Sequence, residues 1–559
     1  MRRQVIALAA VLAATLVLAG CDAIPDSGPV REGLPRLEQV ERSVQFNPPG
    51  PVAGADQETI VRGFVRAASS SEKDYEIARE FLAPGYAEQW DPSLGVLVTE
   101  GAPQFQSSKE GSAVISLRVM ASIDAEGTLT PAEPERQTDL PFELVRVGGE
   151  WRISSAPAGI ILERSTFNAV WISRQVHYLS ADGRLVPEMR WFLNRSTLST
   201  QIVREVLAGP SEAMTPALHT AAPSGTTLIS GSVPIVDGTA MIDLSTEVFQ
   251  ADEAALEQLK RQLAASLRSV PGVTRFQLLV HGSAVDDVNA AIADEGSGSD
   301  AQFTAVLREG QFGMVTTGEV RPLEGIGERV VELAPSEVTV AVDRSAVAVR
   351  HQGGVSVVTE SDTLEVDDRR GLLPPSLDAL GYVWTYSHAS PGELWATPAS
   401  GEVEATVLST PWLEGREVTA VRVSMGGNRV AALVENDGAS EVLVAGIVRD
   451  EAGAPIGLTE TATTQLWEQG APIDFTWISD LRFAVLSESG LLGSSSRITV
   501  GEVGGFESDS GAVVGGAAIA GVSNHAYLRV LDDQRRLFKP QGNGWQQQLG
   551  EVELLAKVG

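Results

Sequence analysis

The spacing of apolar residues divides the chain into two segments of mixed helix and strand, followed by a long segment of strands. In the first segment, apolar residues recur every three or four positions over 60–65 and again over 75–82, which predicts two helices. The period then changes to two over 115–121, which predicts a strand. We therefore expect a small α+β domain with helices first and a sheet after them.

The second segment repeats an order of strands and a helix. Gly209-Pro210 ends the first predicted helix, and Leu256, Leu259 and Leu263 share one face of the second. The expected elements are strands at 175–179 and 185–192, a helix at 200–207, strands at 227–236 and 240–244, a helix at 253–267 and a last strand at 275–280. We place His177 and His281 in strands of this domain, as packed side chains.

From residue 301 onward, short apolar strands follow one another with Gly, Asp and Ser at the turns. Three stretches each give a strand, a polar turn and a second strand: "VTVAVDRSAVAVR", "VRVSMGGNRVAALVE" and "FTWISDLRFAVLSE". These degenerate repeats indicate the blades of a β-propeller. At about 40–45 residues a blade the segment holds about six irregular blades, and five or seven would also fit.

The start of the chain has the order of a secretory signal peptide. Arg2 and Arg3 precede an apolar run over 5–17, which is shorter than the roughly 20 residues that a membrane-spanning helix needs. The run ends at Leu18-Ala19-Gly20-Cys21, which matches a bacterial lipobox with cleavage between Gly20 and Cys21.

Cys21 is the single cysteine of the chain and the predicted lipid attachment point. Lipoprotein maturation requires a thiol, because diacylglycerol is joined through a thioether before the freed amino group is acylated. Two or three acyl chains give durable anchoring where one gives marginal binding. The Pro- and Gly-rich residues that follow, to about residue 56, predict a flexible tether.

The charge of the chain excludes nucleic acid as a partner. It has 73 acidic and 42 basic residues, and loss of Arg2 and Arg3 with the signal peptide changes the net charge from -31 to 40 - 73 = -33. Nucleic acid binding needs clustered cations, and an acidic surface is also repelled by anionic lipids. We expect attachment to the membrane through the lipid, and protein partners.

Signals for catalysis and for metals are sparse. The six histidines are scattered without the spacing of a zinc site, and no nucleophile elbow or Walker sequence is present. The acidic linker at 294–300 lacks the ligand positions of a calcium loop. Asp367-Asp368 and Asp532-Asp533 could form carboxylate dyads, but we expect them on the solvated surface. We assign no catalytic, cofactor-binding or metal-binding residue and expect no enzyme activity.

Parts of the chain resemble known domains. "FELVRVGGEWRISSAP", whose Gly148-Gly149 predicts a hairpin turn, resembles the end of an NTF2-like domain, in which Tyr86, Trp90 and Trp151 could line a pocket or fill the core. "REVLAGPS", "MIDLS" and "VPGV" resemble the GerMN domain, a binding or assembly module. The predicted fold class is therefore multidomain: a lipidated tether, an NTF2-like and a GerMN-like α+β domain, and an all-β propeller.

The whole mature chain resembles the LpqB family of actinobacterial lipoproteins. The resemblance is carried by this domain order, by "GFVRAASSSEKDYEIAREFLAPGYAEQW" at 63–90 and by "LGYVWTYSHASPGELWAT" at 380–397. It implies a protein on the extracytoplasmic side of the cell membrane that binds the sensor kinase MtrB and modulates phosphorylation of MtrA, with effects on cell-wall homeostasis and division. An envelope hydrolase acting from the propeller face and a solute-binding lipoprotein are the alternatives.

The predicted organisation assigns every part of the chain. It consists of a signal peptide (1–20), the lipidated cysteine and tether (21–56), the NTF2-like domain (57–165), the GerMN-like domain (166–293), a linker (294–300) and the propeller (301–559).

We expect a Cys21→Ser variant to lose its lipid, because a serine hydroxyl cannot form the thioether. Labelled palmitate should not be incorporated, and the protein should move from the membrane fraction to the soluble fraction. A Ser27→Ala variant, altered in the tether, is the control and should behave as the parent chain. Continued labelling of Cys21→Ser would contradict the assignment.

Overall fold

The computed structural model describes residues 48–559, except 134–136, 286–289, 292–301, 317, 402–403 and 490–494. The signal peptide, the lipobox residues Leu18, Ala19, Gly20 and Cys21, most of the tether and the 294–300 linker lie outside the described residues. No helix in the described part of the chain is long and apolar enough to cross a membrane.

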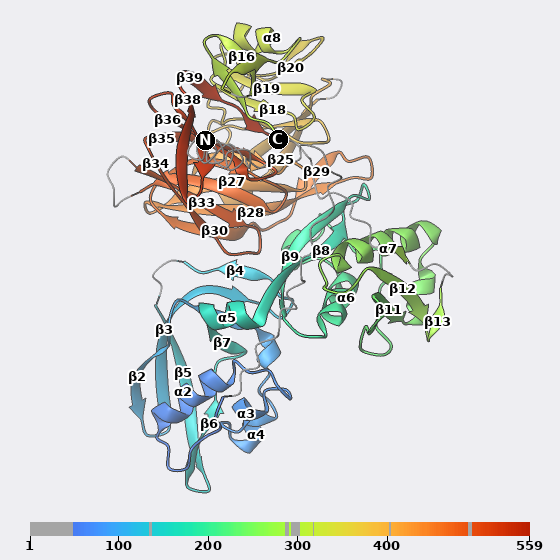
Figure 1. Ribbon diagram of the computed structural model, residues 1–559, viewed down its shortest axis with the longest axis vertical. Coiled ribbons are helices and arrows are strands. Elements are labelled where there is room, and N and C mark those ends of the chain that lie inside the picture. Colours follow the sequence, from blue (N-terminus) through green and yellow to red (C-terminus); the bar gives the residue numbers. More distant parts are fainter. Residues whose placement is uncertain are drawn as a thin grey trace, which may run out of the picture. The chain divides into compact units, whose positions relative to one another are not determined.

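The first domain packs helices against a seven-stranded sheet (Figure 1). The sheet has the order β6-β5-β3-β1-β7, with β2 and β4 also pairing with β3. Its elements are α2 (Gln57–Ala67), α3 (Glu76–Arg79), α4 (Pro84–Ala87), β1 (Val96–Thr99), β2 (Gln104–Lys109), β3 (Ser112–Ile123), β4 (Leu129–Pro131), β5 (Gln137–Val147), β6 (Glu150–Ser155) and β7 (Ile160–Glu163).

Helix α2 confirms the first predicted helix. Asp56 caps it by accepting a hydrogen bond from the Thr59 amide at 2.9 Å, and Ile60, Val61 and Phe64 are buried. The second predicted helix is shorter than expected: α3 ends at Arg79, because the main chain of Phe81 pairs with Ile153 of β6. Helices precede the sheet as predicted, and kinship with NTF2-like domains stays a prediction.

The second domain places two helices beside a small sheet and a long hairpin. Strands β11 and β12 pair in parallel in the order β10-β11-β12-β13, while β8 and β9 form a separate antiparallel pair. The elements are α5 (Arg164–Val170), β8 (Trp171–Leu179), β9 (Leu185–Leu193), α6 (Leu198–Ala208), β10 (Ile235–Val236), β11 (Thr239–Leu244), α7 (Glu253–Leu267), β12 (Arg275–Val280), β13 (Ser283–Ala284) and β14 (Ala290–Ala291).

Most of the second domain matches the sequence prediction, with two exceptions. The strand predicted over 227–236 is wrong, since only Ile235–Val236 pair with β11 as a strand. The segment before them contains Gly231 with a φ of +65°, a conformation that breaks a strand. His281 lies in an exposed turn after β12, whereas His177 is packed within β8.

In the described residues the third domain is a ring of six sheets, as expected for a propeller of about six blades. Their strands are antiparallel except for the last strand of the chain. The first sheet contains β15 (Ala305–Arg308), β16 (Gln311–Val315), β17 (Val320–Pro322) and β39 (Val552–Leu555). The second contains β18 (Glu337–Val340), β19 (Ala346–His351), β20 (Gly354–Thr359), β21 (Thr363–Asp367) and β40 (Lys557–Val558). The third contains β22 (Ser376–Leu377), β23 (Tyr382–Tyr386), β24 (Glu393–Pro398) and β25 (Thr406–Ser409).

The other three sheets complete the ring. The fourth sheet contains β26 (Glu417–Val423), β27 (Arg429–Asn436), β28 (Ala439–Arg449), β29 (Pro455–Leu458) and β30 (Thr463–Gln469). The fifth contains β31 (Pro472–Trp477), β32 (Arg482–Glu488), β33 (Ser495–Glu502) and β34 (Ser508–Val514). The sixth contains β35 (Gly516–Val522), β36 (Asn524–Asp532), β37 (Leu537–Gln541) and β38 (Gly544–Leu549). One short helix, α8 (Gly327–Glu332), lies against β16.

The ring is closed by the last strands of the chain. Strand β39 supplies the inner strand of the first sheet by pairing with β15, and β40 pairs in parallel with β18 of the second. The three repeats found in the sequence are the inner hairpins β18–β19, β26–β27 and β31–β32. Strand pairing between distant parts of the chain therefore leaves no open edge at the junction.

Charged side chains fill the centre of the ring. The buried Lys557 ammonium donates to Asp474 Oδ2 at 2.6 Å and to the Ile519 carbonyl at 2.8 Å. The buried Arg422 guanidinium donates to Thr339 Oγ1 at 3.2 Å and to the Pro375 carbonyl. Burial lowers the pKa of Arg422 to about 10. These contacts tie together inner strands from several blades.

The β8–β9 hairpin contacts both neighbouring domains. The Trp191 amide donates to the Gly127 carbonyl of the first domain at 2.8 Å, and its indole Nε1 donates to the Gly504 carbonyl of the propeller at 2.9 Å. At the hairpin tip, Arg184 Nη1 donates to the Gly426 carbonyl at 2.6 Å. The hairpin thus positions three domains against one another.

Histidine 177 makes the second domain sensitive to acid. Burial, together with the charge of Arg268, lowers its pKa to about 4, against about 6.5 in an unfolded chain. The unfolded chain therefore binds the proton first. Packing of the neutral His177 side chain thus contributes to the free energy of unfolding, and this contribution is complete above pH 6.5. It is lost as the pH falls toward 4, by up to about 3 kcal/mol at 1.36 kcal/mol per pKa unit.

We expect a His177→Gln variant to lose less stability than the parent between pH 6.5 and 4. Urea unfolding of the mature chain, followed by tryptophan fluorescence, measures the difference, because Trp171 and Trp191 lie on the same hairpin. The exposed His281→Gln is the matched control and should keep the parent's dependence. Equal acid sensitivity of His177→Gln and the parent would refute this account.

Candidate binding site on the propeller

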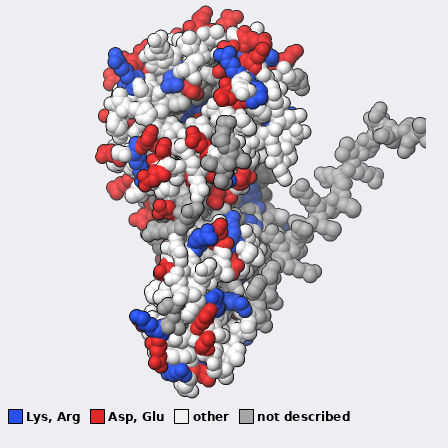
Figure 2. Space-filling model, turned by 90° about the vertical axis from the view of Figure 1, so that its left-hand side faces the viewer, with Lys and Arg blue, Asp and Glu red and all other residues white. Residues whose placement is uncertain are grey.

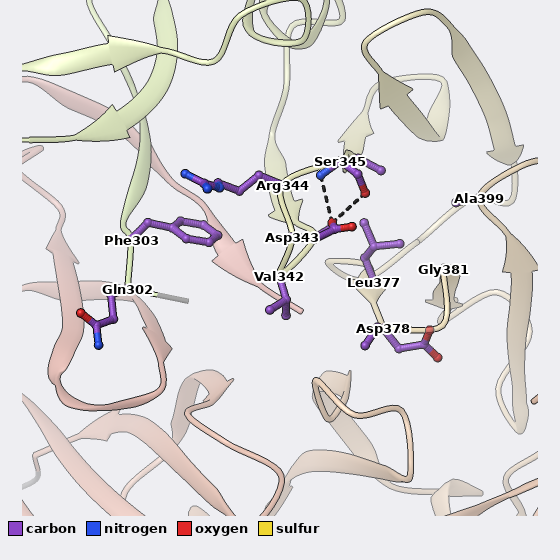
Figure 3. Close-up of a pocket in the computed structure, with 13 residues that line it drawn as sticks. Gln302, Phe303, Val342, Asp343, Arg344, Ser345, Leu377, Asp378, Gly381 and Ala399 are labelled. Carbon is purple, nitrogen blue, oxygen red and sulfur yellow. Dashed lines mark hydrogen bonds between the residues drawn. The ribbon is translucent and has the colours of Figure 1, made fainter. Parts of the chain in front are cut away.

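One face of the propeller carries a cavity of about 640 Å³. The first strands of all blades run in the same direction along the axis, so the turns between first and second strands lie on one face. The cavity is built from two such turns, after β18 and after β22, together with residues 302–303 (Figure 3). Its volume is within the range of sites that bind small molecules or single side chains.

Apolar side chains form most of the cavity wall. Figure 3 shows Phe303 and Leu377 on opposite sides of the turn that carries Val342 and Asp343. Arg344, in the same turn, is exposed, and its guanidinium carbon lies 5.9 Å from the centre of the Phe303 ring. The site therefore offers an apolar surface edged by one cation, which suits a protein side chain or short segment.

The two carboxylates of the cavity have structural partners. Asp343 Oδ1 accepts from the Ser345 amide at 3.0 Å and from its hydroxyl at 2.7 Å, and these hydrogen bonds lower the pKa of Asp343. Asp378 is buried and accepts from Trp384 Nε1 at 2.8 Å and from Arg449 Nη2 at 2.5 Å. Both carboxylates therefore accept hydrogen bonds from residues of the propeller itself.

The cavity lies on the face that also receives the β8–β9 hairpin. Arg184 of the hairpin reaches Gly426 in the turn after β26, and Arg429 Nη2 donates back to the Pro187 carbonyl at 2.5 Å. Asp480, in the turn after β31, accepts from the Gly426 amide at 2.7 Å. Successive turns on this face are thus linked, and the hairpin contacts blades next to those that form the cavity.

The acidic pairs considered from the sequence are not dyads. In each pair one carboxylate is buried and one exposed, contrary to the expectation that both are solvated. Asp367 accepts from Arg369 Nη2 at 2.8 Å and from the Thr385 hydroxyl, and Asp532 accepts from Arg536 Nε at 2.6 Å. The sequence did not predict these ion pairs. Each arginine follows its aspartate closely in a turn, and only the folded structure shows that the aspartate is buried.

Two further predictions from the sequence concern metals and the aromatic pocket. In the part of the chain that the structure describes, no three His, Cys, Asp or Glu side chains gather at metal-binding distance.

The aromatic residues predicted to line a pocket lie apart. Trp90 lines a cavity, but the Tyr86 hydroxyl donates to the Ala156 carbonyl at 3.0 Å, and the guanidinium carbon of Arg146 lies 4.4 Å from the centre of the Trp151 ring. The three aromatic residues therefore do not share one pocket.

The visible surface is consistent with the acidic composition. Figure 2 shows acidic side chains spread over one face, with smaller groups of basic ones between them and no continuous basic patch.

Each domain is similar to a known protein family. Residues 50–168 match a family model described as the N-terminal domain of lipoprotein LpqB, residues 175–286 match one described as sporulation and spore germination, and residues 310–554 match the LpqB β-propeller domain. None of these models describes a catalytic family.

Relatives are similar to this chain over most of its length. The chain is 26% identical to a lipoprotein LpqB of Bifidobacterium longum, over 82% of each chain. It is 27% identical to one of Streptomyces coelicolor, over 87% of this chain and 86% of the relative. The match to the first GerMN domain of the sporulation protein GerM from Bacillus subtilis covers 22% of this chain and 95% of that domain, at 19% identity and with a TM-score of 0.19.

We expect Arg449→Met to destabilise the propeller by about 3–5 kcal/mol, because it leaves the buried Asp378 carboxylate without its cation. The double variant Asp378→Asn/Arg449→Met should lose less than the sum of the two single changes, since no charge is then left unpaired. Urea unfolding of the four proteins measures the coupling. Strict additivity would show that the pair does not stabilise the turn beside the cavity.

Proposed function

The chain belongs to the LpqB family of lipoproteins, and on that premise we propose that it is a lipid-anchored accessory protein of a sensor kinase. In this proposal it binds the extracytoplasmic domain of the kinase MtrB and modulates phosphorylation of MtrA, which affects cell-wall homeostasis and division. The observation that carries the proposal is the apolar cavity on the propeller face, edged by Arg344.

Attachment to the membrane follows from the sequence. The lipobox at Leu18-Ala19-Gly20-Cys21 supplies the thiol, and the relatives are named lipoproteins. We place the folded domains on the extracytoplasmic side, because a signal peptide precedes the cysteine. Anchoring both proteins in one membrane raises the local concentration of each for the other, so a weak contact is sufficient.

The proposed role does not require catalysis. The carboxylates that face or border the propeller cavity accept structural hydrogen bonds, and the buried acids of the two sequence pairs are bound by arginines. A binding protein changes a kinase by preferring one of its states. A preference of about 1.4 kcal/mol changes the ratio of kinase states tenfold.

The test is a titration of the mature chain, residues 22–559, against the extracytoplasmic domain of MtrB. We expect saturable binding, and a changed rate of autophosphorylation when the chain is added to full-length MtrB in membranes. Absence of binding at tens of micromolar would overturn the proposal. Turnover of a cell-wall substrate would instead support the hydrolase alternative.

A pair of charge reversals tests the binding face. We expect Arg344→Glu to weaken kinase binding about tenfold or more, corresponding to at least about 1.4 kcal/mol. Arg535→Glu is the matched control: both arginines are exposed and have positive φ, at 64° and 62°. Arg535 lies in the turn between β36 and β37, which is on the opposite face, so its reversal should leave the affinity unchanged. Equal effects of the two reversals would exclude this face.

A further inference from the structure

A second cavity, of about 690 Å³, lies where the first domain, the β8–β9 hairpin and helix α6 meet. It is larger than the propeller cavity and has a different lining. Nothing in the proposed kinase contact uses it. Its volume is that of a site for a disaccharide or a short peptide.

Tryptophan rings from two domains form its walls. Trp90 of the first domain is 3% exposed and packs edge-on against Tyr75, with ring centres 5.8 Å apart. Trp171 and Trp191 of the hairpin both pack against Phe167, at 5.8 and 4.9 Å. Because packing fixes all three rings, the walls need little ordering when a ligand binds.

The cavity carries a large excess of negative charge. Six acidic side chains and two arginines line it, which gives a formal charge of 2 - 6 = -4. The acidic residues are Asp74, Glu88, Asp91, Asp124, Glu126 and Glu205.

Both arginines are already engaged in local contacts. Arg79 pairs with Asp74 at 2.9 Å and also donates to main-chain carbonyls, and Arg204 donates to the Gly231 carbonyl at 2.8 Å. Neither arginine forms an ion pair with Glu205 among the contacts of the described residues. Most of the negative charge is therefore available to a cation from outside.

Glu205 is the acid whose environment most favours a cationic ligand. Within the described part of the chain its carboxylate accepts no hydrogen bond, although the side chain is largely buried. Burial raises its pKa to about 7; the charge of Arg190 opposes this rise, while Glu126, Asp124 and Glu188 add to it. A carboxylate in such a place gains most when a positive charge arrives beside it.

We propose that this cavity binds a small ligand carrying a protonated primary amine. The amine lies near Glu205 and over the rings of Trp171 and Trp191, where cation–π attraction adds about 0.5–2 kcal/mol. The Trp90 ring already carries the Arg79 guanidinium, whose carbon lies 5.3 Å from the ring centre. Free N–H groups of Arg204 are suited to hydroxyl or carbonyl oxygens of the same ligand. An amino sugar and a lysine-containing peptide share this chemistry.

The experiment is calorimetric titration of the mature chain, residues 22–559, with three probes. These are a β-1,4-linked glucosamine disaccharide, its N-acetylated counterpart and the dipeptide Lys-Ala. We expect one of the two amines to bind with a Kd below about 1 mM. N-acetylation, which removes the charge and keeps the sugar, should weaken binding at least about tenfold. Tighter binding of the disaccharide identifies a saccharide site, and tighter binding of Lys-Ala identifies a peptide site.

Substitutions separate this cavity from other acidic surfaces. Glu205→Gln keeps the shape and removes the charge, and should weaken amine binding at least about tenfold. Glu212→Gln, an exposed acid of the same domain outside the cavity, is the matched control. Arg344→Glu should leave amine binding unchanged, so failure here and failure of kinase binding are distinguishable. Absence of amine binding, equal binding of the acetylated sugar, or an unaffected Glu205→Gln would overturn the proposal.

Discussion

The buried ion pair between Glu188 and Arg190 on strand β9 is the interaction on which the arrangement of the domains depends. Arg190 is 1% exposed, and its guanidinium donates to Glu188 at 3.2 Å and to the Thr128 hydroxyl of the first domain at 2.5 Å. Glu188 accepts from the Ser211 hydroxyl at 2.6 Å. Removal of either charge would leave the other buried and unpaired, at a cost of about 3–5 kcal/mol.

The β8–β9 hairpin forms part of one candidate site and contacts the propeller face that carries the other. Its base carries Trp171 and Trp191, which form one wall of the acidic cavity, while its tip contacts the propeller through Arg184. The same strand pair thus borders a site for a small ligand and reaches the face proposed to bind a kinase. A ligand that changed the order of the hairpin would have a direct physical route to that face.

The propeller uses buried charge in a related way. Lys557 and Asp474 pair at its centre, and Asp378 and Arg449 pair beside the cavity. Such pairs add little net stability compared with apolar residues, but they penalise any arrangement that leaves a charge unpaired. In a ring of six similar sheets, that penalty helps to specify which strands meet. The pairing of β39 with β15 then closes the ring between residues far apart in the chain.

The sequence by itself determined the domain order, most of the helices and strands, and the inner hairpins of three blades. These features depend on local apolar periodicity and on residues such as Gly209 and Pro210 that end an element, so neighbouring positions carry the information. The lipobox at Cys21 is likewise a local signal. Tertiary structure alone decided the shortening of α3, the loss of the strand before Ile235 and the burial of Asp367 and Asp532. It also decided both cavities, because their walls come from residues distant in the chain, and no local pattern records which distant side chains meet.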